Sequence, residues 1–183
     1  MRFIGVAGRK SSGKSDVVQL LHEYFINVET LSFSEPIKQM TKIAYMFTDY
    51  QLGEGKDVMD NHWGMTPRDA MRSTGNMMTF MDDSHMVDLM SHKIGSIDTS
   101  GLKILCLADL RFENEVDLVK KLGGFVIHVR NVNDDLSDEH ISEVYSDDII
   151  HDADYLLTND GNMDNMRAQC ENIFHQIHLR NNQ

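Results

Sequence analysis

Residues 8–15 read Gly8-Arg9-Lys10-Ser11-Ser12-Gly13-Lys14-Ser15, which matches the pattern G-x-x-x-x-G-K-[ST] at every fixed position. An apolar stretch precedes the motif and an amphipathic stretch follows it, so the context is strand, loop, helix. In that context the glycines let backbone N–H groups turn inward and bind phosphate beside the N-terminus of the helix. The alternative is a Gly/Ser-rich turn that only joins strand to helix. The full pattern with its flanks favours a nucleoside triphosphate site.

Three side chains of this loop have expected roles. Lys14 is expected to reach the outer phosphates, and the Ser15 hydroxyl is expected to ligate Mg²⁺. Lys10 adds a second positive charge that triphosphate binding alone does not require. Its presence indicates a second anion nearby.

The pattern of apolar residues predicts an α/β protein with a parallel sheet covered by helices on both faces. The predicted strands are Arg2–Ala7, Val28–Phe33, Lys103–Leu107, Phe125–Val129 and Tyr155–Thr158. The predicted helices are Lys14–Phe25, Pro36–Phe47, Pro67–Thr74, Ser84–Lys93, Glu113–Leu122 and Met163–Ile177. Two long stretches, 48–66 and 131–146, match neither pattern, and we interpret both as segments that close over a substrate.

The length of 183 residues suits a single domain. The charge is unevenly distributed along this chain. The formal net charge is −12, of which residues 1–130 carry −2 and residues 131–183 carry −10. A strongly acidic chain disfavours binding to a nucleic-acid polymer, because such binding relies on Lys and Arg at many phosphates. The nearly balanced first part is where we expect a small anion to bind.

Targeting and redox signals predict a soluble cytoplasmic protein. The apolar start of the chain is too short for a signal peptide, and no run reaches the roughly 18 apolar residues of a membrane span. The two cysteines, Cys106 and Cys170, lack metal-type spacing and are expected to be free thiols.

His128, His140 and His151 show no metal-binding motif, so we do not predict a metal cage. The Met-rich run 77–90 is expected to fill the core, or else to line an adaptable pocket.

Asp109 and Arg111 follow a predicted buried strand, where ligands bind in open α/β sheets. Asp109 could hold Mg²⁺ or orient the acceptor oxygen, and the alternative is a helix N-cap. Arg111 could clamp a phosphate with two hydrogen bonds, and the alternative is an ion pair with Glu113 or Glu115.

Three further arginines are candidates for phosphate contact. Arg68 and Arg72 lie four residues apart on one predicted helix face, which could receive a monophosphate or simply face solvent. Arg130 ends a predicted strand and could move onto a transferring phosphoryl group, or be an ordinary surface arginine.

With these residues in view, the chain resembles the deoxynucleoside monophosphate kinases of bacteriophages, a branch of the P-loop nucleotide kinases. The resemblance covers nearly the whole chain. Its motifs are the phosphate loop, Ser34-Glu35-Pro36-Ile37-Lys38, the arginine-rich segment 67–75, Asp109-Leu110-Arg111, residues 124–130, His140-Ile141-Ser142-Glu143 and Thr158-Asn159-Asp160-Gly161.

The resemblance implies a single 183-residue domain with the three-layer P-loop NTPase fold, an acceptor-binding region at 48–93 and a mobile lid-like loop at 131–146. It also implies transfer of a phosphoryl group from Mg·ATP to a deoxynucleoside 5′-monophosphate, in the host cytoplasm if the protein is phage-encoded. Whether the protein forms a homodimer is left open.

The resemblance assigns the site residues by group. The implied ATP-binding residues are Gly8, Arg9, Lys10, Ser11, Ser12, Gly13, Lys14, Ser15 and Asp16. The implied monophosphate-binding residues are Lys10, Ser34, Lys38, Arg68, Arg72, Gly75, Asn76, Asp109, Arg111, His140 and Glu143. Lys14, Asp109, Arg111 and Arg130 would be catalytic, and Ser15 and Asp109 would hold Mg²⁺.

The chain departs from the family pattern on the acceptor side. Asn76 and Met77 stand where relatives usually have Thr and an acidic residue, and Met86 stands where a Trp is usual. Two alternatives therefore stay open. One is a kinase for another small acceptor, such as dephospho-coenzyme A, and the other is a nucleotide-binding regulatory protein without turnover.

Overall fold

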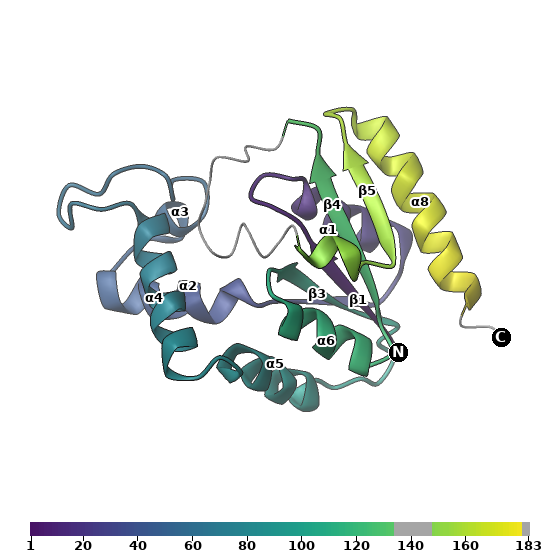
Figure 1. Ribbon diagram of the computed structural model, residues 1–183, viewed down its shortest axis with the longest axis horizontal. Helices are drawn as coiled ribbons and strands as arrows, with labels where there is room; N and C mark the ends of the chain where they lie inside the picture. The colour runs from purple at the N-terminus through teal and green to yellow at the C-terminus, as the bar shows by residue number, and fades with distance from the viewer. Residues whose placement is uncertain (134–147, 181–183) are drawn as a thin grey trace. The chain divides into compact units, whose positions relative to one another are not determined.

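The computed structural model describes residues 1–133 and 148–180 (Figure 1). The chain divides into two compact units. The first comprises Met1–Ser32 and Ser96–Gln183, and the second comprises Phe33–Gly95. The first holds the sheet and the phosphate loop, and the second is built from helices. The predicted acceptor-binding region, residues 48–93, falls within the second unit.

Five strands form one sheet in the first unit. They are β1 (Arg2–Ala7), β2 (Val28–Ser32), β3 (Ile104–Leu110), β4 (Phe125–Asn131) and β5 (Tyr155–Asn159). Their order is β2-β3-β1-β4-β5, and every neighbouring pair is parallel. The predicted five-stranded parallel sheet is confirmed. Because all strands run the same way, their carboxyl ends share one edge of the sheet.

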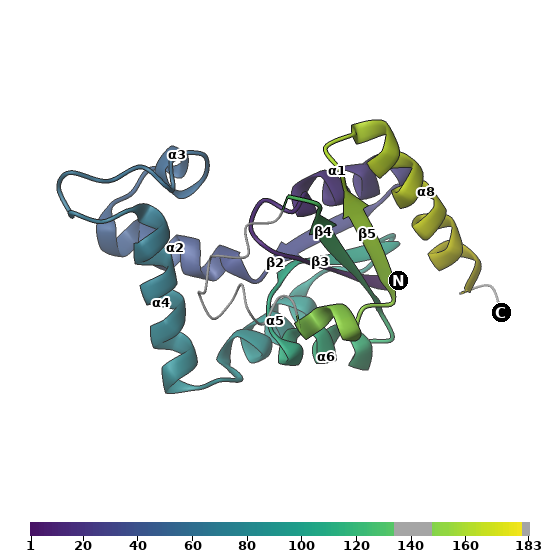
Figure 2. The same cartoon turned by 45° about the horizontal axis from the view of Figure 1, so that its top comes forward.

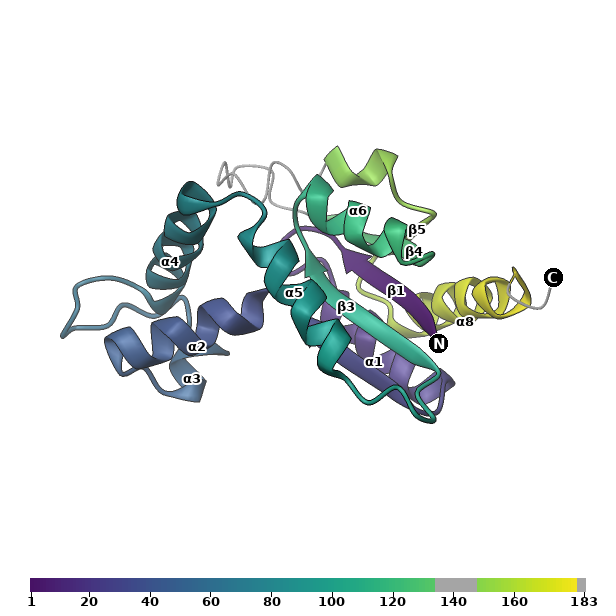
Figure 3. The same cartoon turned by 90° about the horizontal axis from the view of Figure 1, so that it is seen from below.

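Helices cover both faces of this sheet, as predicted. On one face α1 (Lys14–Tyr24) and α8 (Met163–Arg180) pack against a core that includes Ile4 and Val6 of β1. On the other face α6 (Glu113–Lys121) packs so closely that a Cβ at Gly5 would lie 3.0 Å from Val119. Figure 3 shows α6 and the α1–α8 pair on opposite sides of the strands. A short 3₁₀ turn, η1 (Ile149–His151), precedes β5.

The second unit is built from α2 (Ser34–Tyr45), α3 (Asp49–Leu52), α4 (Pro67–Met81) and most of α5 (His85–Ser96). Figure 2 shows α2, α3 and α4 gathered together. Phe47, Leu52 and Ala70 form their small buried core. Helix α4 begins with a capping box, in which Thr66 and Asp69 satisfy each other's backbone N–H groups, and with Pro67 in its first turn.

Two expectations about the second unit need correction. Helix α4 was predicted to end at Thr74 but continues through Gly75 to Met81. The Met-rich run does not simply fill the core: Met78 and Met90 are buried, but Met77 and Met81 are 52% and 79% exposed. Neighbouring positions on a helix point in different directions, so one helix cannot bury a continuous apolar run against a single partner.

Both cysteines are free, as expected, and both are buried. Burial raises the pKa of Cys106 and of Cys170 to about 12, so neither thiol is a ready nucleophile at neutral pH. No helix in the described part of the chain is long and apolar enough to cross a membrane.

Candidate nucleotide-binding site

The phosphate loop leaves the end of β1 and returns as the first turn of α1. Gly8 and Gly13 have φ angles of +140° and +105°, which residues other than glycine rarely adopt. A Cβ at Gly8 would lie 2.3 Å from the carbonyl oxygen of Val129 in β4, so the loop passes against that strand with no room for a side chain. The backbone conformation of the loop and its close approach to β4 therefore both require glycine in this motif.

Lys14 places its ammonium group inside this loop, with the residue only 8% exposed. Its Nζ donates hydrogen bonds to the carbonyl oxygens of Gly8 at 2.8 Å and Arg9 at 2.7 Å. Both contacts are charge-assisted and hold the cation at the mouth of the loop. Phosphate oxygens are stronger acceptors for an ammonium than neutral carbonyls, so this position suits phosphate recognition.

The Ser12 hydroxyl is the clearest sign of a missing partner in the loop. Ser12 is 1% exposed, and its Oγ has no hydrogen-bond partner among the described residues. Leaving a buried hydroxyl unpaired costs about 1–3 kcal/mol. A phosphate oxygen bound in the loop would satisfy it.

Two asparagines hold the loop from neighbouring strands, and sequence reasoning did not assign them to the site. Asn131 at the end of β4 donates from Nδ2 to the carbonyl oxygen of Ser11, and Asn159 at the end of β5 donates to that of Ser12. From the sequence, Asn159 was placed only within the family motif Thr158-Asn159-Asp160-Gly161, with no role in the site. The signal that identifies them is the register, in which Asn131 pairs with Asn159.

Asp109 lies at the carboxyl edge of the sheet, as predicted, on a bulge. Leu107 pairs with Gly5 and Leu110 with Ala7, so β3 has two residues where β1 has only Val6. Asp109 has a φ of +63°, and its Oδ2 accepts a hydrogen bond from Ser32 at 3.0 Å. Bulges next to active sites commonly redirect a side chain, and this one carries a strained aspartate.

The alternative reading of Asp109 as a helix N-cap is wrong, because α6 begins after Phe112. Glu115 holds the segment between them. It is 4% exposed, and its Oε2 accepts from the backbone N–H of Arg111 at 2.6 Å and of Phe112 at 3.3 Å. Burial raises the pKa of Glu115 to about 7, although these hydrogen bonds oppose the shift. From the sequence, Glu115 was considered only as a candidate ion-pair partner of the Arg111 side chain.

The predicted Mg²⁺ ligands fit the ion by donor chemistry. Ser15, which is exposed, supplies a hydroxyl in the first turn of α1, and Asp109 supplies carboxylate oxygens. Mg²⁺ prefers oxygen ligands and is commonly held by one or two protein groups together with water and substrate phosphates. Residues 1–133 and 148–180 contain no cluster of three or more His, Cys, Asp or Glu side chains suited to a metal.

The other predicted residues of the first unit lie at or near the same edge. Arg130 is exposed in β4, one residue before Asn131, and Asp16 is in the first turn of α1. Arg9 is buried in the loop, while Lys10 is half-buried and Ser11 exposed. His140 and Glu143 lie outside the described residues, as does most of the predicted lid-like loop.

The second unit carries the remaining predicted acceptor residues. They are Ser34 and Lys38 on α2, and Arg68, Arg72, Gly75 and Asn76 on α4. Arg68 forms a two-point ion pair with Asp57, in which Nε pairs with Oδ1 and Nη2 lies 3.0 Å from Oδ2. A Cβ at Gly75 would lie 3.2 Å from Ile37 Cδ1, so this glycine also serves the packing of α4 on α2.

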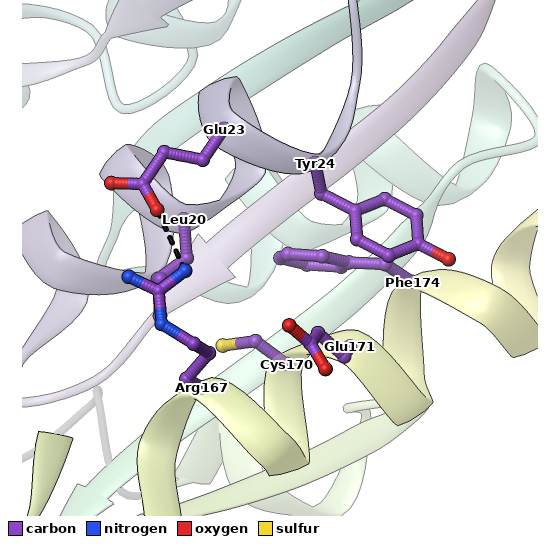
Figure 4. A pocket seen from close by; sticks show the side chains of 7 residues that line it. All are labelled: Leu20, Glu23, Tyr24, Arg167, Cys170, Glu171 and Phe174. Atoms are coloured by element: carbon purple, nitrogen blue, oxygen red, sulfur yellow. Dashed lines mark hydrogen bonds and ion pairs between the residues drawn. The ribbon is translucent and has the colours of Figure 1, made fainter. Parts of the chain in front are cut away.

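A separate small hollow lies between α1 and α8 (Figure 4). Its volume is about 100 Å³, and Glu23 and Arg167 form an ion pair of 2.7 Å at its wall. Sites for ligands of nucleotide size usually enclose roughly 300–1,000 Å³. Cys170 also lines the hollow, and its raised pKa makes it inert. We do not assign this hollow to the nucleotide.

Comparison with known proteins agrees with this geometry. A family model described as deoxynucleotide monophosphate kinase matches residues 54–170. A putative deoxynucleotide monophosphate kinase of Acanthamoeba polyphaga mimivirus is 29% identical over 161 residues, which is 79% of this chain and 81% of that protein. The deoxynucleotide monophosphate kinase of Escherichia phage RB69 is 22% identical over 169 residues, covering 87% of this chain and 68% of that protein.

A solved structure shows the same fold. The dephospho-CoA kinase from Campylobacter jejuni superposes with a TM-score of 0.53 at 13% identity, covering 96% of this chain and 97% of that one. At this identity the likeness concerns the fold alone. The sheet, the loop and the flanking helices therefore follow the architecture of a P-loop kinase.

Proposed function

Because the chain belongs to the deoxynucleotide monophosphate kinase family and is a nucleotide kinase, we propose that it transfers the γ-phosphoryl group of ATP to a deoxynucleoside 5′-monophosphate. The products would be ADP and the deoxynucleoside diphosphate. One observation carries the donor side of this proposal: the Ser12 hydroxyl, which is buried and has no hydrogen-bond partner among the described residues, lies in a loop that also contains the buried Lys14 ammonium. A bound triphosphate would offer oxygens to both groups.

The donor phosphates would bind along the loop. Lys14 would exchange its contacts with two loop carbonyls for contacts with phosphate oxygens, and Ser12 would gain the acceptor that it lacks. The N-terminus of α1 adds partial positive charge at the same place. Mg²⁺, held by Ser15 and Asp109, would neutralise charge on the phosphates when bound.

The acceptor would be positioned by the cationic groups assigned to it. From the first unit these are Lys10 and Arg111, and from the second Lys38, Arg68 and Arg72. Phosphoryl transfer needs little covalent help from protein groups, so correct placement and positive charge are the expected catalytic means. Arg130, exposed at the end of β4, would stabilise the charge of the transferring group.

We place this reaction in the cytoplasm, of the host if the protein is phage-encoded, because its two cysteines are free thiols. Its partners would be ATP and the monophosphate. The net charge of −12 argues against a nucleic-acid polymer as a partner.

The deciding experiment is a coupled assay of ADP formation with purified protein, Mg·ATP and each deoxynucleoside monophosphate in turn. Dephospho-coenzyme A serves as a competing acceptor. Turnover with one or more deoxynucleoside monophosphates supports the proposal. Activity confined to the other acceptor contradicts the substrate class, and ATP binding without any turnover contradicts phosphoryl transfer.

The same assay tests the role of Lys14 through the Lys14→Ala variant. We expect kcat to fall by about 10²–10³-fold, the usual cost of removing one preorganised charge-stabilising donor. Lys121→Ala, on the exposed end of α6, is the control for the loss of a lysine. Circular dichroism checks that the fold is retained. Near-normal turnover by Lys14→Ala would remove Lys14 from its assigned role.

A further inference from the structure

Asn131 and Asn159 are cross-strand neighbours, since they pair in the parallel register of β4 and β5. Figures 1 and 2 show these two strands side by side, with their carboxyl ends at the same edge of the sheet. Each asparagine is the last residue of its strand. The two carboxamides therefore lie next to each other at the edge where the phosphate loop begins.

The two side chains use their polar atoms in the same way. The Oδ1 atom of Asn131 accepts from the N–H of Asn133 at 2.8 Å, and that of Asn159 accepts from Gly161 at 2.9 Å. With the oxygen engaged in its own turn, the Nδ2 group of each residue faces the loop. Asn131 donates to the Ser11 carbonyl at 3.4 Å, and Asn159 to the Ser12 carbonyl at 2.9 Å.

This dual use explains the residue type. Aspartate could accept the turn N–H but has no hydrogen to donate to a carbonyl, whereas asparagine does both. Gly13 completes the fit, because a Cβ at this position would lie 2.5 Å from Asn159 Nδ2. The amide of Asn159 thus occupies the space over Gly13, whose φ is +105°.

Holding these carbonyls also sets the direction of a backbone donor. In a trans peptide the C=O and the following N–H point to opposite sides. Anchoring the Ser12 carbonyl to Asn159 therefore directs the Gly13 N–H away from β5. The preceding N–H, that of Ser12, already donates to Arg9 within the loop at 3.2 Å.

We propose that Asn159, assisted by Asn131, is a positioning residue that holds the phosphate loop with the Gly13 N–H turned toward the donor phosphates. The proposal rests on ATP being the donor. Neither asparagine touches the nucleotide; each acts through a loop carbonyl. Asn159 has the shorter contact, so it should matter more than Asn131.

The test compares Asn159→Asp with Asn162→Asp. Both changes replace an amide by a carboxylate, and both keep the oxygen that accepts backbone N–H groups, since Asn162 Oδ1 accepts from Asp164 and Asn165 at the start of α8. Only Asn159→Asp removes a donor to the loop. Asn159→Ala removes that donor without adding charge, and Asn131→Asp tests the longer contact.

Three quantities are measured: the Kd for Mg·ATP by calorimetry, hydrogen exchange of the amides of residues 12–14 without ligand, and the KM for the monophosphate by steady-state kinetics. For Asn159→Asp and Asn159→Ala we expect the Kd for Mg·ATP to rise about tenfold, the effect of losing roughly one hydrogen bond. Exchange should also be faster. Asn131→Asp should show a smaller change, Asn162→Asp neither change, and the KM for the monophosphate should stay within about twofold in all four.

An unchanged Kd for Mg·ATP in Asn159→Asp overturns the proposal, even if exchange is faster, because the contact would then serve stability alone. Weaker binding in Asn159→Asp but not in Asn159→Ala also overturns it, since the added charge would be the cause. If the unmodified protein shows no ATP binding, the proposed function fails. The exchange measurement then still decides whether the asparagines hold the loop.

Discussion

Asp109 combines a strained backbone with a charge at the edge of the sheet. Its φ of +63° lies in the left-handed region, which aspartate and asparagine tolerate better than most residues. The Ser32 hydroxyl donates a hydrogen bond to one carboxylate oxygen, Oδ2. Strain of this kind persists only where the surrounding structure enforces it.

Asp109→Asn should separate charge from structure. Asparagine tolerates the same φ and keeps an oxygen for Ser32, so we expect the free energy of unfolding to change by less than about 0.5 kcal/mol. Turnover should fall by at least about 10²-fold, because the amide cannot replace the carboxylate as a Mg²⁺ ligand. Urea denaturation and the coupled assay measure the two effects. Normal turnover in this variant would mean that the charge of Asp109 is not used.

Arg68 is held in place by Asp57, and two variants distinguish a structural from a substrate-binding role. Arg68→Ala should raise the KM for the monophosphate by about 10–100-fold, the cost of a charge-assisted contact to phosphate, and leave the KM for ATP nearly unchanged. Asp57→Ala removes the same ion pair but keeps the guanidinium, so it should not raise the monophosphate KM in this way. Steady-state kinetics with each substrate varied gives both constants. Equal effects of the two variants on KM would assign Arg68 to structure alone.

At the scale of elements, the connection from β3 to α6 depends on a buried acid. Glu115 is the third residue of α6, and its carboxylate reaches back to the N–H groups of Arg111 and Phe112. The contacts tie the segment that carries Arg111 to the first turn of the helix. This is a local capping arrangement at the start of α6.

The raised pKa of Glu115 predicts a pH-dependent stability. Since the pKa rises from 4.5 to about 7 on folding, the folded protein holds a proton that the unfolded chain releases between these values. Stability from this group is therefore full below pH 4.5 and falls with rising pH, by up to about 1.4 kcal/mol per pH unit, until about pH 7.

Glu115→Gln should remove this slope, because glutamine keeps an accepting oxygen but does not titrate. Urea denaturation of both proteins from pH 5 to 8 measures the difference in unfolding free energy, in which the other titrating groups cancel. We expect the variant to gain stability relative to the unmodified protein as the pH rises. A difference that stays constant with pH would contradict the raised pKa.

The predicted ends of two elements differ from the observed ends, because contacts with neighbouring elements extend them. The helix predicted over Pro67–Thr74 continues as α4 through Gly75 to Met81, and a Cβ at Gly75 would lie 3.2 Å from Ile37 Cδ1 of α2. Strand β3 was predicted to end at Leu107 and extends to Leu110 through a bulge that pairing with β1 creates. In the described part of the chain, periodicity predicted every strand and the six longer helices but not the short α3 or η1, and the ends of the elements depended on neighbours.

At the scale of the whole molecule, the predicted substrate contacts divide between the two units. The residues assigned to ATP all lie in the first unit, while those assigned to the monophosphate lie in both. The acidic excess is concentrated in residues 131–183, whereas the cationic residues assigned to phosphate contact all lie in residues 1–130. Each substrate should therefore protect a different part of the chain.

Hydrogen exchange with each ligand tests this division. Mg·ATP should slow exchange in residues 8–16 and leave residues 33–95 nearly unchanged. The accepted monophosphate should slow exchange in α2 and α4, around Lys38 and Arg68. Saturating ligand at about 100 times its Kd should add roughly 2.7 kcal/mol of stability, which thermal unfolding checks. Protection by the monophosphate confined to the first unit would refute the assignments in α2 and α4.

The sequence alone determined the α/β class, the succession of strands and longer helices along the chain, the phosphate loop and the family. These features depend on residues that are close in sequence or that follow a regular spacing, so a single chain displays them directly. The assignment of Asp109 to the carboxyl edge of the sheet followed from the same reasoning.

Only the tertiary structure decided how the site is held. Asn131 and Asn159 reach the loop across 120 and 147 residues of sequence, and Asp109 is turned by a bulge that exists only when β3 pairs with β1. Such contacts depend on strand order and register, which bring distant residues together without leaving a local pattern. The motif residues could be read from the chain, but the partners that orient them become visible only once the sheet is formed.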